Sequence, residues 1–306
     1  TQGLHRGFVQ VPRDLDVMAM RWRSSLVWPG FAALIVWLGL ACPACAQAPG
    51  LGIGAELVDP HVFRVCADPH DLPFSNQARD GFENRIAGVI AKDLGKKLGF
   101  TWQPQVFGFL RTTLYSYRCD VVMGITQGAT TVGNSNAYYR SAYVLIFRPH
   151  SGFDGIESLE DTRLKGKRIG IIAGTPPATI LAENDLLDHI HSYELSVNTK
   201  YFAPSRTLVQ DLEHGKIDIG ILWGPIAGYF ASRSHGALAI VPLLHESSDG
   251  PPMEFSIVMG VREADDAWRR TLNQAIAKSE PEITRILESY GVPLLDARNK
   301  LIYAGG

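Results

Sequence analysis

The chain has 306 residues, of which 46% are hydrophobic and 20% charged, and its formal net charge at pH 7 is −2. These values are typical of a globular protein. They exclude a disordered tail, a collagen-like fibre and a protein with many membrane-spanning helices. The near balance of charge also leaves no basic surface of the kind that binds nucleic acid.

The first 46 residues have the organisation of a bacterial secretory signal. Basic residues precede a short apolar run at 26–40, and small residues occupy the positions that end at Ala46. A membrane anchor is the alternative, but the run is shorter than the roughly 20 apolar residues that a span requires, and Pro29 interrupts it. We therefore expect cleavage after Ala46 and export to the periplasm, with membrane contact only through the uncleaved signal. Residues 1–17 are interpreted as an extension of the gene model.

Beyond this leader the chain keeps two cysteines, Cys66 and Cys119, in a compartment where disulfides form. If both lay on adjacent parallel strands with an offset of three residues, their Cα atoms would be about 10 Å apart. A disulfide allows roughly 7 Å. A bulge, or the way the chain enters the second strand, can close that gap, so a bridge and two free thiols both stay open, and we favour the bridge.

A linker rich in Gly and Pro, residues 47–61, leads into two similar α/β units. In the first unit, hydrophobic periodicity predicts strands at 62–66, 101–107 and 119–124 and helices at 84–98 and 110–117. In the second, it predicts strands at 167–173, 197–202 and 217–222 and helices at 177–187 and 205–214. Each unit ends in an Asp followed by an apolar run that is typical of a buried parallel strand. The intervals from Arg64 to Asp120 and from Arg168 to Asp218 are also similar.

Two extended apolar segments, 143–147 and 255–261, are interpreted as crossings between the units. Helices at 264–279 and 281–290 then return to the first unit, with Pro281 in the first turn of the second helix. Lobe one is expected to comprise residues 62–148 and 256–306, and lobe two residues 149–255. The fold class is α/β, with two doubly wound sheets joined by a two-strand hinge and ligands bound where the strands end at the cleft.

Several segments, in this order along the chain, resemble the periplasmic solute-binding proteins of the polar-amino-acid type, the family 3 extracellular solute-binding proteins. The segments that carry the resemblance are 64–75 (RVCADPHDLPFS), 81–84 (GFEN), 119–124 (CDVVMG), 137–141 (AYYRS), 170–175 (GIIAGT) and 225–227 (PIA). A narrower resemblance, to the MoxJ/XoxJ type of quinoprotein-dehydrogenase-associated protein, is carried by 68–76, 81–84, 174–177 (GTPP) and 291–293 (GVP). The resemblance covers about residues 62–295 and implies a bilobal, type II-like periplasmic-binding-protein fold.

The narrower resemblance implies a periplasmic accessory protein of a PQQ-dependent methanol (alcohol) dehydrogenase. Such a protein would bind the dehydrogenase large subunit, with its cytochrome c as a further candidate partner, and support maturation or activity. PQQ and calcium or a lanthanide are then expected in the partner, and no cofactor in this chain. The alternative is the substrate-binding protein of an ABC transporter for a small polar solute other than a standard amino acid.

Three features of the family's amino-acid site are missing or weakened. The loop at 126–131 has no Arg to grip a carboxylate, Pro176 and Pro177 have no N–H to donate, and Trp223 stands where an amine-binding Asp is expected. The cleft residues that we expect to bind a ligand or partner are Asp68, Phe74, Glu83, Thr126, Gln127, Thr175 and Trp223.

Each of these side chains also has an ordinary structural interpretation. Glu83 fits a carboxylate at a helix start, Asp68 a turn before proline, and Phe74 and Trp223 caps on a hydrophobic core. No Ser/His/Asp or paired-carboxylate arrangement and no nucleotide-binding glycine loop stands out, so no catalytic residue and no enzyme activity are expected. His189 and His191 lack a third ligand, so no metal site is expected either.

Overall fold

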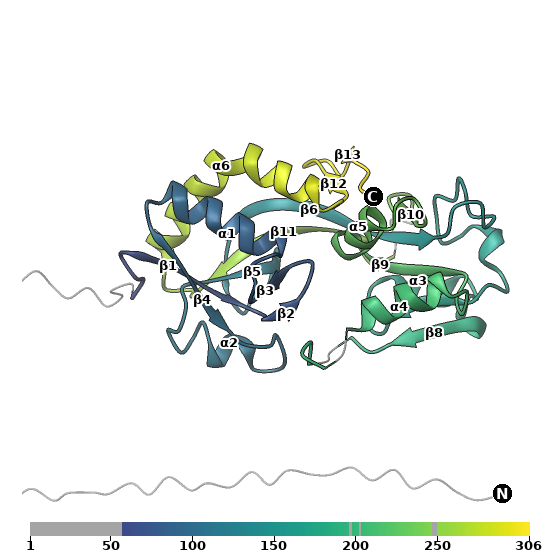
Figure 1. Ribbon diagram of the computed structural model, residues 1–306, viewed down its shortest axis with the longest axis horizontal. Coiled ribbons are helices and arrows are strands. Elements are labelled where there is room, and N and C mark those ends of the chain that lie inside the picture. The colour runs from purple at the N-terminus through teal and green to yellow at the C-terminus, as the bar shows by residue number, and fades with distance from the viewer. Residues whose placement is uncertain (1–56, 196–197, 202, 247–249) are drawn as a thin grey trace, which may run out of the picture. The chain divides into compact units, whose positions relative to one another are not determined.

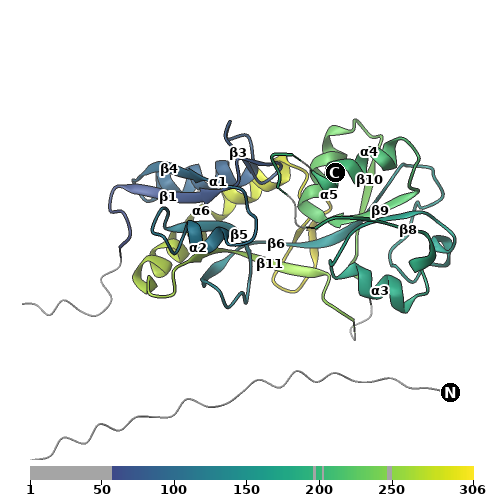
Figure 2. The same ribbon diagram turned by 90° about the horizontal axis from the view of Figure 1, so that it is seen from below.

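Strand β6, Gly133–Phe147, runs through both halves of the described chain. Its residues 133–142 pair antiparallel with β11, Glu254–Val261, and its residues 143–147 pair with β9, Ile219–Trp223. The computed structural model describes residues 57–195, 198–201, 203–246 and 250–306, all within one compact unit. Figures 1 and 2 show β6 and β11 side by side where the chain passes from one lobe to the other. The predicted leader and most of the predicted linker lie outside the described residues.

Lobe one is built on a parallel core of three strands. β1, Val62–Ala67, lies between β4, Lys97–Trp102, and β5, Val121–Thr126. Helices α1, Phe82–Asp93, and α6, Asp266–Ser289, cover one face of this sheet, and the short α2, Phe109–Thr112, lies on the other side (Figure 1). A hairpin of β2, His70–Asp71, and β3, Ser75–Asn76, follows β1. The core packs apolar residues of β1, α1, β5, β11 and α6 together.

Lobe two repeats the plan around β6. β7, Ile169–Ile172, pairs in parallel with β9 and with β8, Ile190–Tyr193, and β10, Ala239–Pro242, pairs with the end of β6. The helices are α3, Pro177–Glu183, α4, Pro204–Glu213, and α5, Gly224–Arg233. Short 3₁₀ turns lie at Thr162–Leu164 and Leu187–His189, and a small C-terminal hairpin joins β12, Leu294–Leu295, to β13, Leu301–Tyr303. The α/β class predicted from the sequence is confirmed.

The change of lobe along β6 falls earlier than the sequence predicted. Residues 144–147 pack in the cores of lobe two, although the predicted boundary placed them in lobe one. The crossing therefore lies at residues 142–143, where β6 leaves β11 for β9. The return crossing precedes β11, whose residues Phe255 and Ile257 pack with the core of lobe one.

Several element boundaries also differ from the prediction. Helix α1 stops at Asp93 instead of 98, because Gly95 has φ +64° and the chain enters β4 at Lys97. The helix expected at 110–117 is only the single turn α2. The strand expected at 197–202 lies earlier, at β8, and residues 198–201 of that segment form a turn. Helix α5 was not predicted.

The two predicted C-terminal helices are one helix, α6, with Pro281 inside it. A proline here removes one backbone hydrogen bond and crowds the preceding turn. The buried stripe of α6 nevertheless continues across it at spacings of three and four residues, through Ile276, Ser279, Ile283 and Leu287. Pro281 itself faces solvent, so its ring does not interrupt this stripe. Packing of the continuous stripe then offsets the lost hydrogen bond. Among the described residues no helix is long and apolar enough to cross a membrane.

The Arg and Asp residues that bound the similar intervals of the two lobes form an ion pair in each lobe. Arg64 on β1 donates from Nε and Nη2 to the two carboxylate oxygens of Asp120, each at 2.7 Å. Arg168 before β7 makes the same two-pronged contact with Asp218, at 3.1 and 2.5 Å. Asp120 is fully buried and receives a further bond from Arg262 at 2.8 Å. Each pair joins the start of one strand to the start of its parallel neighbour.

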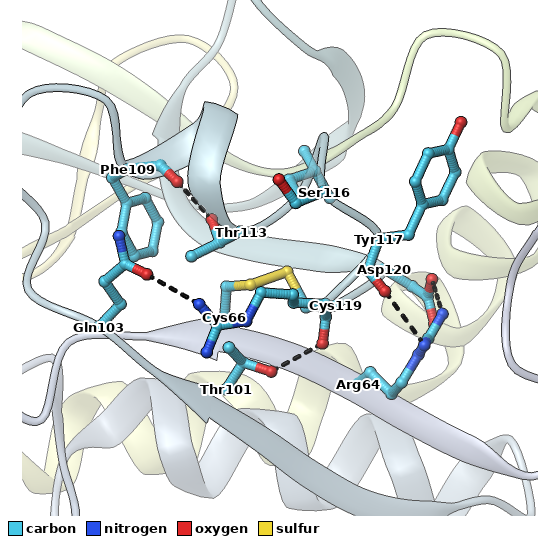
Figure 3. Close-up of a disulfide and its surroundings, with 12 residues drawn as sticks. Arg64, Cys66, Thr101, Gln103, Phe109, Thr113, Ser116, Tyr117, Cys119 and Asp120 are labelled. Atoms are coloured by element: carbon cyan, nitrogen blue, oxygen red, sulfur yellow. Dashed lines mark hydrogen bonds and ion pairs between the residues drawn. A yellow bond between two sulfur atoms is a disulfide. The ribbon is translucent and has the colours of Figure 1, made fainter.

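Cys66 and Cys119 are joined by a disulfide, with their Cα atoms 5.5 Å apart (Figure 3). In the ladder, Cys66 lies opposite Val122, three residues beyond Cys119. The gap closes because the chain reaches β5 from a series of turns after α2 and does not run along the strand direction at Cys119. The bridge therefore fixes the α2 loop to the end of β1.

Removing this bridge should destabilise the protein. A Cys66→Ala/Cys119→Ala variant is expected to lose about 2–4 kcal/mol of unfolding free energy, since a disulfide across a separation of 53 residues restricts the unfolded chain. Urea denaturation followed by circular dichroism measures the loss, and reduced wild type serves as the control. Two titratable thiols in denatured, unreduced protein that lacks its leader would contradict the bridge.

Candidate functional site

A cavity of about 350 Å³ lies between the lobes at the ends of β5 and β9. This is the edge at which α/β sheets bind ligands. Lobe one, the crossing strands and lobe two all contribute to its wall. The lining residues are Asp71, Phe74, Ser75, Glu83, Gln105, Met123, Gly124, Thr126, Tyr139, Tyr143, Pro176, Trp223, Phe255 and Ile257.

The loop after β2 is held against the first turn of α1. The backbone N–H of Phe82 donates to the carbonyl of Pro73 at 2.9 Å, and that of Glu83 to the carbonyl of Phe74 at 3.0 Å. A Cβ at Gly81 would lie 2.1 Å from the Phe74 carbonyl oxygen, so only glycine fits there. This close approach brings Asp71, at the end of β2, and Phe74, in the loop that follows, to the same cavity as Glu83 of α1.

Glu83 is 7% exposed, and one of its oxygens has a defined partner. The Tyr138 hydroxyl donates to Oε1 at 3.2 Å and itself accepts from the backbone N–H of Gly124 at 3.0 Å. Gly124 has φ +73°, and a Cβ there would lie 2.7 Å from Glu83 Oε1. Among the described residues, no hydrogen-bond donor reaches the other oxygen, Oε2.

Burial raises the pKa of both carboxyl groups in the cavity. The pKa of Glu83 rises to about 8, through burial first and then through the nearby charge of Asp71. The pKa of Asp71 rises to about 7, through burial and the charge of Asp68. Removal from water disfavours the ionised form, and a like charge adds to that effect. Asp71 and Glu83 thus bring two carboxyl groups to one cavity, a pair that did not stand out in the sequence.

Three aromatic rings form part of the cavity lining. Tyr143, Trp223 and Phe255 contact one another edge to face, with ring centroids 5.4 to 6.2 Å apart. Burial raises the pKa of Tyr143 to about 12, so its hydroxyl is neutral at physiological pH. The rings supply apolar surface, whereas Asp71, Glu83, Gln105 and Thr126 supply polar groups to the rest of the lining.

Of the predicted cleft residues, Phe74, Glu83, Thr126 and Trp223 line this cavity. Thr175 lines an adjoining part of the cleft, beside Tyr143 and Trp223. The structural interpretations of Phe74 and Glu83 hold as well, because Phe74 packs edge to face on Phe82 and Glu83 lies in the first turn of α1.

Asp68 and Gln127 do not line the cavity. Asp68 is fully buried, and its carboxylate accepts from the backbone N–H groups of His70 and Gln105, each at 2.8 Å. It also accepts from the Thr199 hydroxyl of lobe two at 2.8 and 3.0 Å, so it forms a contact between the lobes. Gln127 is exposed, and its backbone N–H pairs with the Ser256 carbonyl beside the strand ends.

Sequence reasoning missed several residues of the wall. Asp71 lies within segment 64–75, which carries the resemblance, but the pattern around it indicated only a turn. Tyr143 and Phe255 lie in the segments interpreted as crossings, and Tyr139 lies in segment 137–141, and neither pattern indicates which side chains reach a cavity. The part of the chain that the structure describes contains no group of three or more His, Cys, Asp or Glu residues that could hold a metal ion.

The chain is similar to proteins of known family over most of its length, although no family model matches it. It is 32% identical over 286 residues to Protein MoxJ of Methylorubrum extorquens, covering 88% of this chain and 94% of that protein. It is 28% identical over 267 residues to Protein MoxJ of Paracoccus denitrificans, covering 83% and 96%.

Solved structures agree with this similarity. Periplasmic binding protein XoxJ from Methylobacterium extorquens AM1 matches with a TM-score of 0.66 and 41% identity, over 76% of this chain and 99% of that chain. MxaJ from Methlophaga aminisulfidivorans MPT matches with a TM-score of 0.65 and 28% identity, over 76% and 100%. An ancestral cationic amino acid solute-binding protein, with a TM-score of 0.59 and 20% identity over 75% and 95%, shares the fold.

Two lobes joined by β6 and β11, with a cavity at the strand ends between them, define a solute-binding protein of type II fold, as the resemblance implied. Within that class the chain belongs to the MoxJ family.

The close approach at Gly81 can be tested by adding one methyl group. Gly81→Ala is expected to lower the unfolding free energy by about 2–4 kcal/mol, because the new Cβ must displace the Phe74 backbone. The matched control is Gly88→Ala on the same helix, where nothing lies within 4 Å of the added atom. That control should be neutral or stabilise by up to about 1 kcal/mol. Equal stabilities of the two variants would contradict the packing argument.

The raised carboxyl pKa values predict how stability depends on pH. The folded state holds a proton on Glu83 more tightly than the unfolded chain, so this contribution is complete below about pH 4.5 and is lost as pH rises through about 8. Glu83→Gln cannot titrate at this position. Its unfolding free energy relative to that of wild type should therefore increase by about 2–4 kcal/mol from pH 5 to pH 9. Urea denaturation at both pH values measures this, with the exposed Glu282→Gln as control. Parallel curves for wild type and Glu83→Gln would refute the raised pKa.

Proposed function

We propose that this protein is a periplasmic accessory protein of a PQQ-dependent methanol dehydrogenase. It binds the dehydrogenase large subunit and supports its maturation or activity. Membership of the MoxJ family supports this proposal, as does similarity over nearly the whole of periplasmic binding protein XoxJ. PQQ and the metal ion belong to the dehydrogenase, and this chain carries out no reaction of its own.

The charge of the cavity is the observation that carries the proposal. A receptor for an amino acid needs a cationic or N–H donor for the substrate carboxylate. Among the described residues that line this cavity there is no Arg, Lys or His, while Asp71 and Glu83 both face it. The side chain at the start of the second lobe's helix is Pro176, which has no N–H. A standard amino acid would place its carboxylate against two acidic groups.

The mouth of the cleft offers a surface for a protein partner. Gln105 and Leu195 border the same part of the cleft, so the loops that contain them face each other across it. Close by in sequence, Phe107 is fully exposed and Tyr201 is 76% exposed. Exposed aromatic side chains at a cleft are typical anchors of protein interfaces. We place the dehydrogenase contact at this rim.

A transporter receptor for another small polar solute is the second candidate, since the cavity is retained and the exposed Thr126 and Gln105 add uncharged polar side chains to its lining. A receptor would bind its solute in the absence of any dehydrogenase, and its gene would be linked to permease and ATPase genes.

The rim can be tested by truncating its anchors. Phe107→Ala/Tyr201→Ala should weaken binding of the purified dehydrogenase at least tenfold, because buried aromatic anchors carry much of an interface's energy. Surface plasmon resonance with the cofactor-free and the complete dehydrogenase measures this, and micromolar affinity for the wild type suffices for a transient partner. Ile302→Ala, an exposed apolar truncation on β13, is the control and should bind as wild type does.

Deletion of the gene should reduce dehydrogenase activity more than dehydrogenase transcript. Unchanged activity in the deletion strain, together with a thermal shift on addition of a standard amino acid, would overturn the proposal and favour the receptor.

A further inference from the structure

The cavity holds two carboxyl groups whose acceptor capacity is largely unused. The Glu83 side chain is only 7% exposed. Its Oε2 atom accepts no hydrogen bond from any residue that the structure describes. The Asp71 side chain likewise makes no hydrogen bond with any residue that the structure describes, although it lines the same cavity. Oε2 of Glu83 and the half-buried Asp71 carboxyl group are open to the cavity, so both can accept hydrogen bonds from a molecule inside it. A ligand that brings donors and positive charge would use this free acceptor capacity.

The rest of the wall is suited to hydrocarbon next to a cation. The ring cluster of Tyr143, Trp223 and Phe255 presents aromatic surface, and Met123 and Ile257 add apolar surface. Aromatic faces attract cations and contact alkyl groups favourably. The volume of about 350 Å³ lies in the range of small-molecule sites.

We propose that this cavity binds a small organic ammonium ion without a carboxylate group. Asp71 and Glu83 accept its N–H bonds, and the rings of Tyr143, Trp223 and Phe255 contact its alkyl part. This site goes beyond the accessory role, since it requires no dehydrogenase.

The same wall disfavours other ligands. A divalent metal ion needs six or more oxygen ligands or several waters, whereas rings and thioether or aliphatic groups occupy much of this wall. An anion, or the carboxylate of an amino acid, would face Asp71 and Glu83 with no basic side chain among the described lining residues to balance them. A neutral alcohol carries no positive charge, so it would not favour the ionised forms of the two carboxyl groups.

The raised pKa values of the two carboxyl groups are consistent with a cation-binding site in the absence of its cation. Burial makes their ionisation costly in the empty cavity. An ammonium ion beside them favours the ionised forms, as an opposite charge within a few ångström does.

Isothermal titration calorimetry of the purified protein at pH 8 tests the proposal with probes that share one butyl chain and differ in the charge of the head group. n-Butylammonium chloride should bind with a dissociation constant below 1 mM, since an alkylammonium, like lysine, stays charged at this pH. n-Butanol should bind at least tenfold more weakly, and sodium pentanoate should give no binding heat.

Variants identify the groups responsible. Asp71→Asn and Glu83→Gln should each weaken n-butylammonium binding at least tenfold, and Trp223→Leu at least threefold. Glu282→Gln removes the same charge at an exposed position of α6 and should bind as wild type does. Circular dichroism before titration identifies any variant that is unfolded, and Glu83→Gln is expected to remain folded because its amide oxygen can still accept from Tyr138.

Three results would overturn the ammonium site: equal binding of n-butanol and n-butylammonium, unchanged binding by both carboxyl variants, or binding of calcium chloride with no response to n-butylammonium. The proposed accessory role and the proposed ammonium site are tested by independent experiments. Loss of dehydrogenase binding is measured with the Phe107→Ala/Tyr201→Ala variant, which keeps the cavity wall intact.

Discussion

The close contact between the loop after β2 and the start of α1 determines most of the site. Backbone bonds from Phe82 and Glu83 to the carbonyls of Pro73 and Phe74 are possible because residue 81 has no side chain. Through this contact one loop and one helix turn place two carboxyl groups and Phe74 at a single cavity. The charge of the site is therefore a consequence of backbone packing inside lobe one, and lobe two adds Trp223 and Pro176 to the wall.

The two lobes use the same ion-pair arrangement to join neighbouring parallel strands. In each, an Arg at the first strand makes a two-pronged ion pair with an Asp before the neighbouring strand. The pair in lobe one is deeper, since Asp120 is fully buried and also pairs with Arg262, whereas Arg168 of lobe two is about half exposed. Lobe one also carries the disulfide beside this network (Figure 3). The lobe that carries both acidic groups of the cavity is thus the more strongly cross-linked one.

Fold and site give different information about function. The fold is shared with receptors that differ widely in sequence, so it defines the class of protein but no ligand. The site departs from an amino-acid receptor in its charge, because acidic groups occupy the cavity and Asp68, next to a proline, is used to hold the lobes together through Thr199. The cavity and the rim surface proposed for a protein partner are therefore separate features of the molecule.

The sequence alone determined the α/β class, the two-lobed plan and four cleft residues, because apolar periodicity and short turn motifs are local properties of the chain. It left the cysteine pairing open, since that depended on how the chain enters β5. Only the tertiary structure decided that α6 continues through Pro281, where a buried stripe outweighs one lost hydrogen bond. Only the structure could place Asp71 beside Glu83 as well. Twelve positions separate them in sequence, and their proximity follows from packing around Gly81, which no local pattern records.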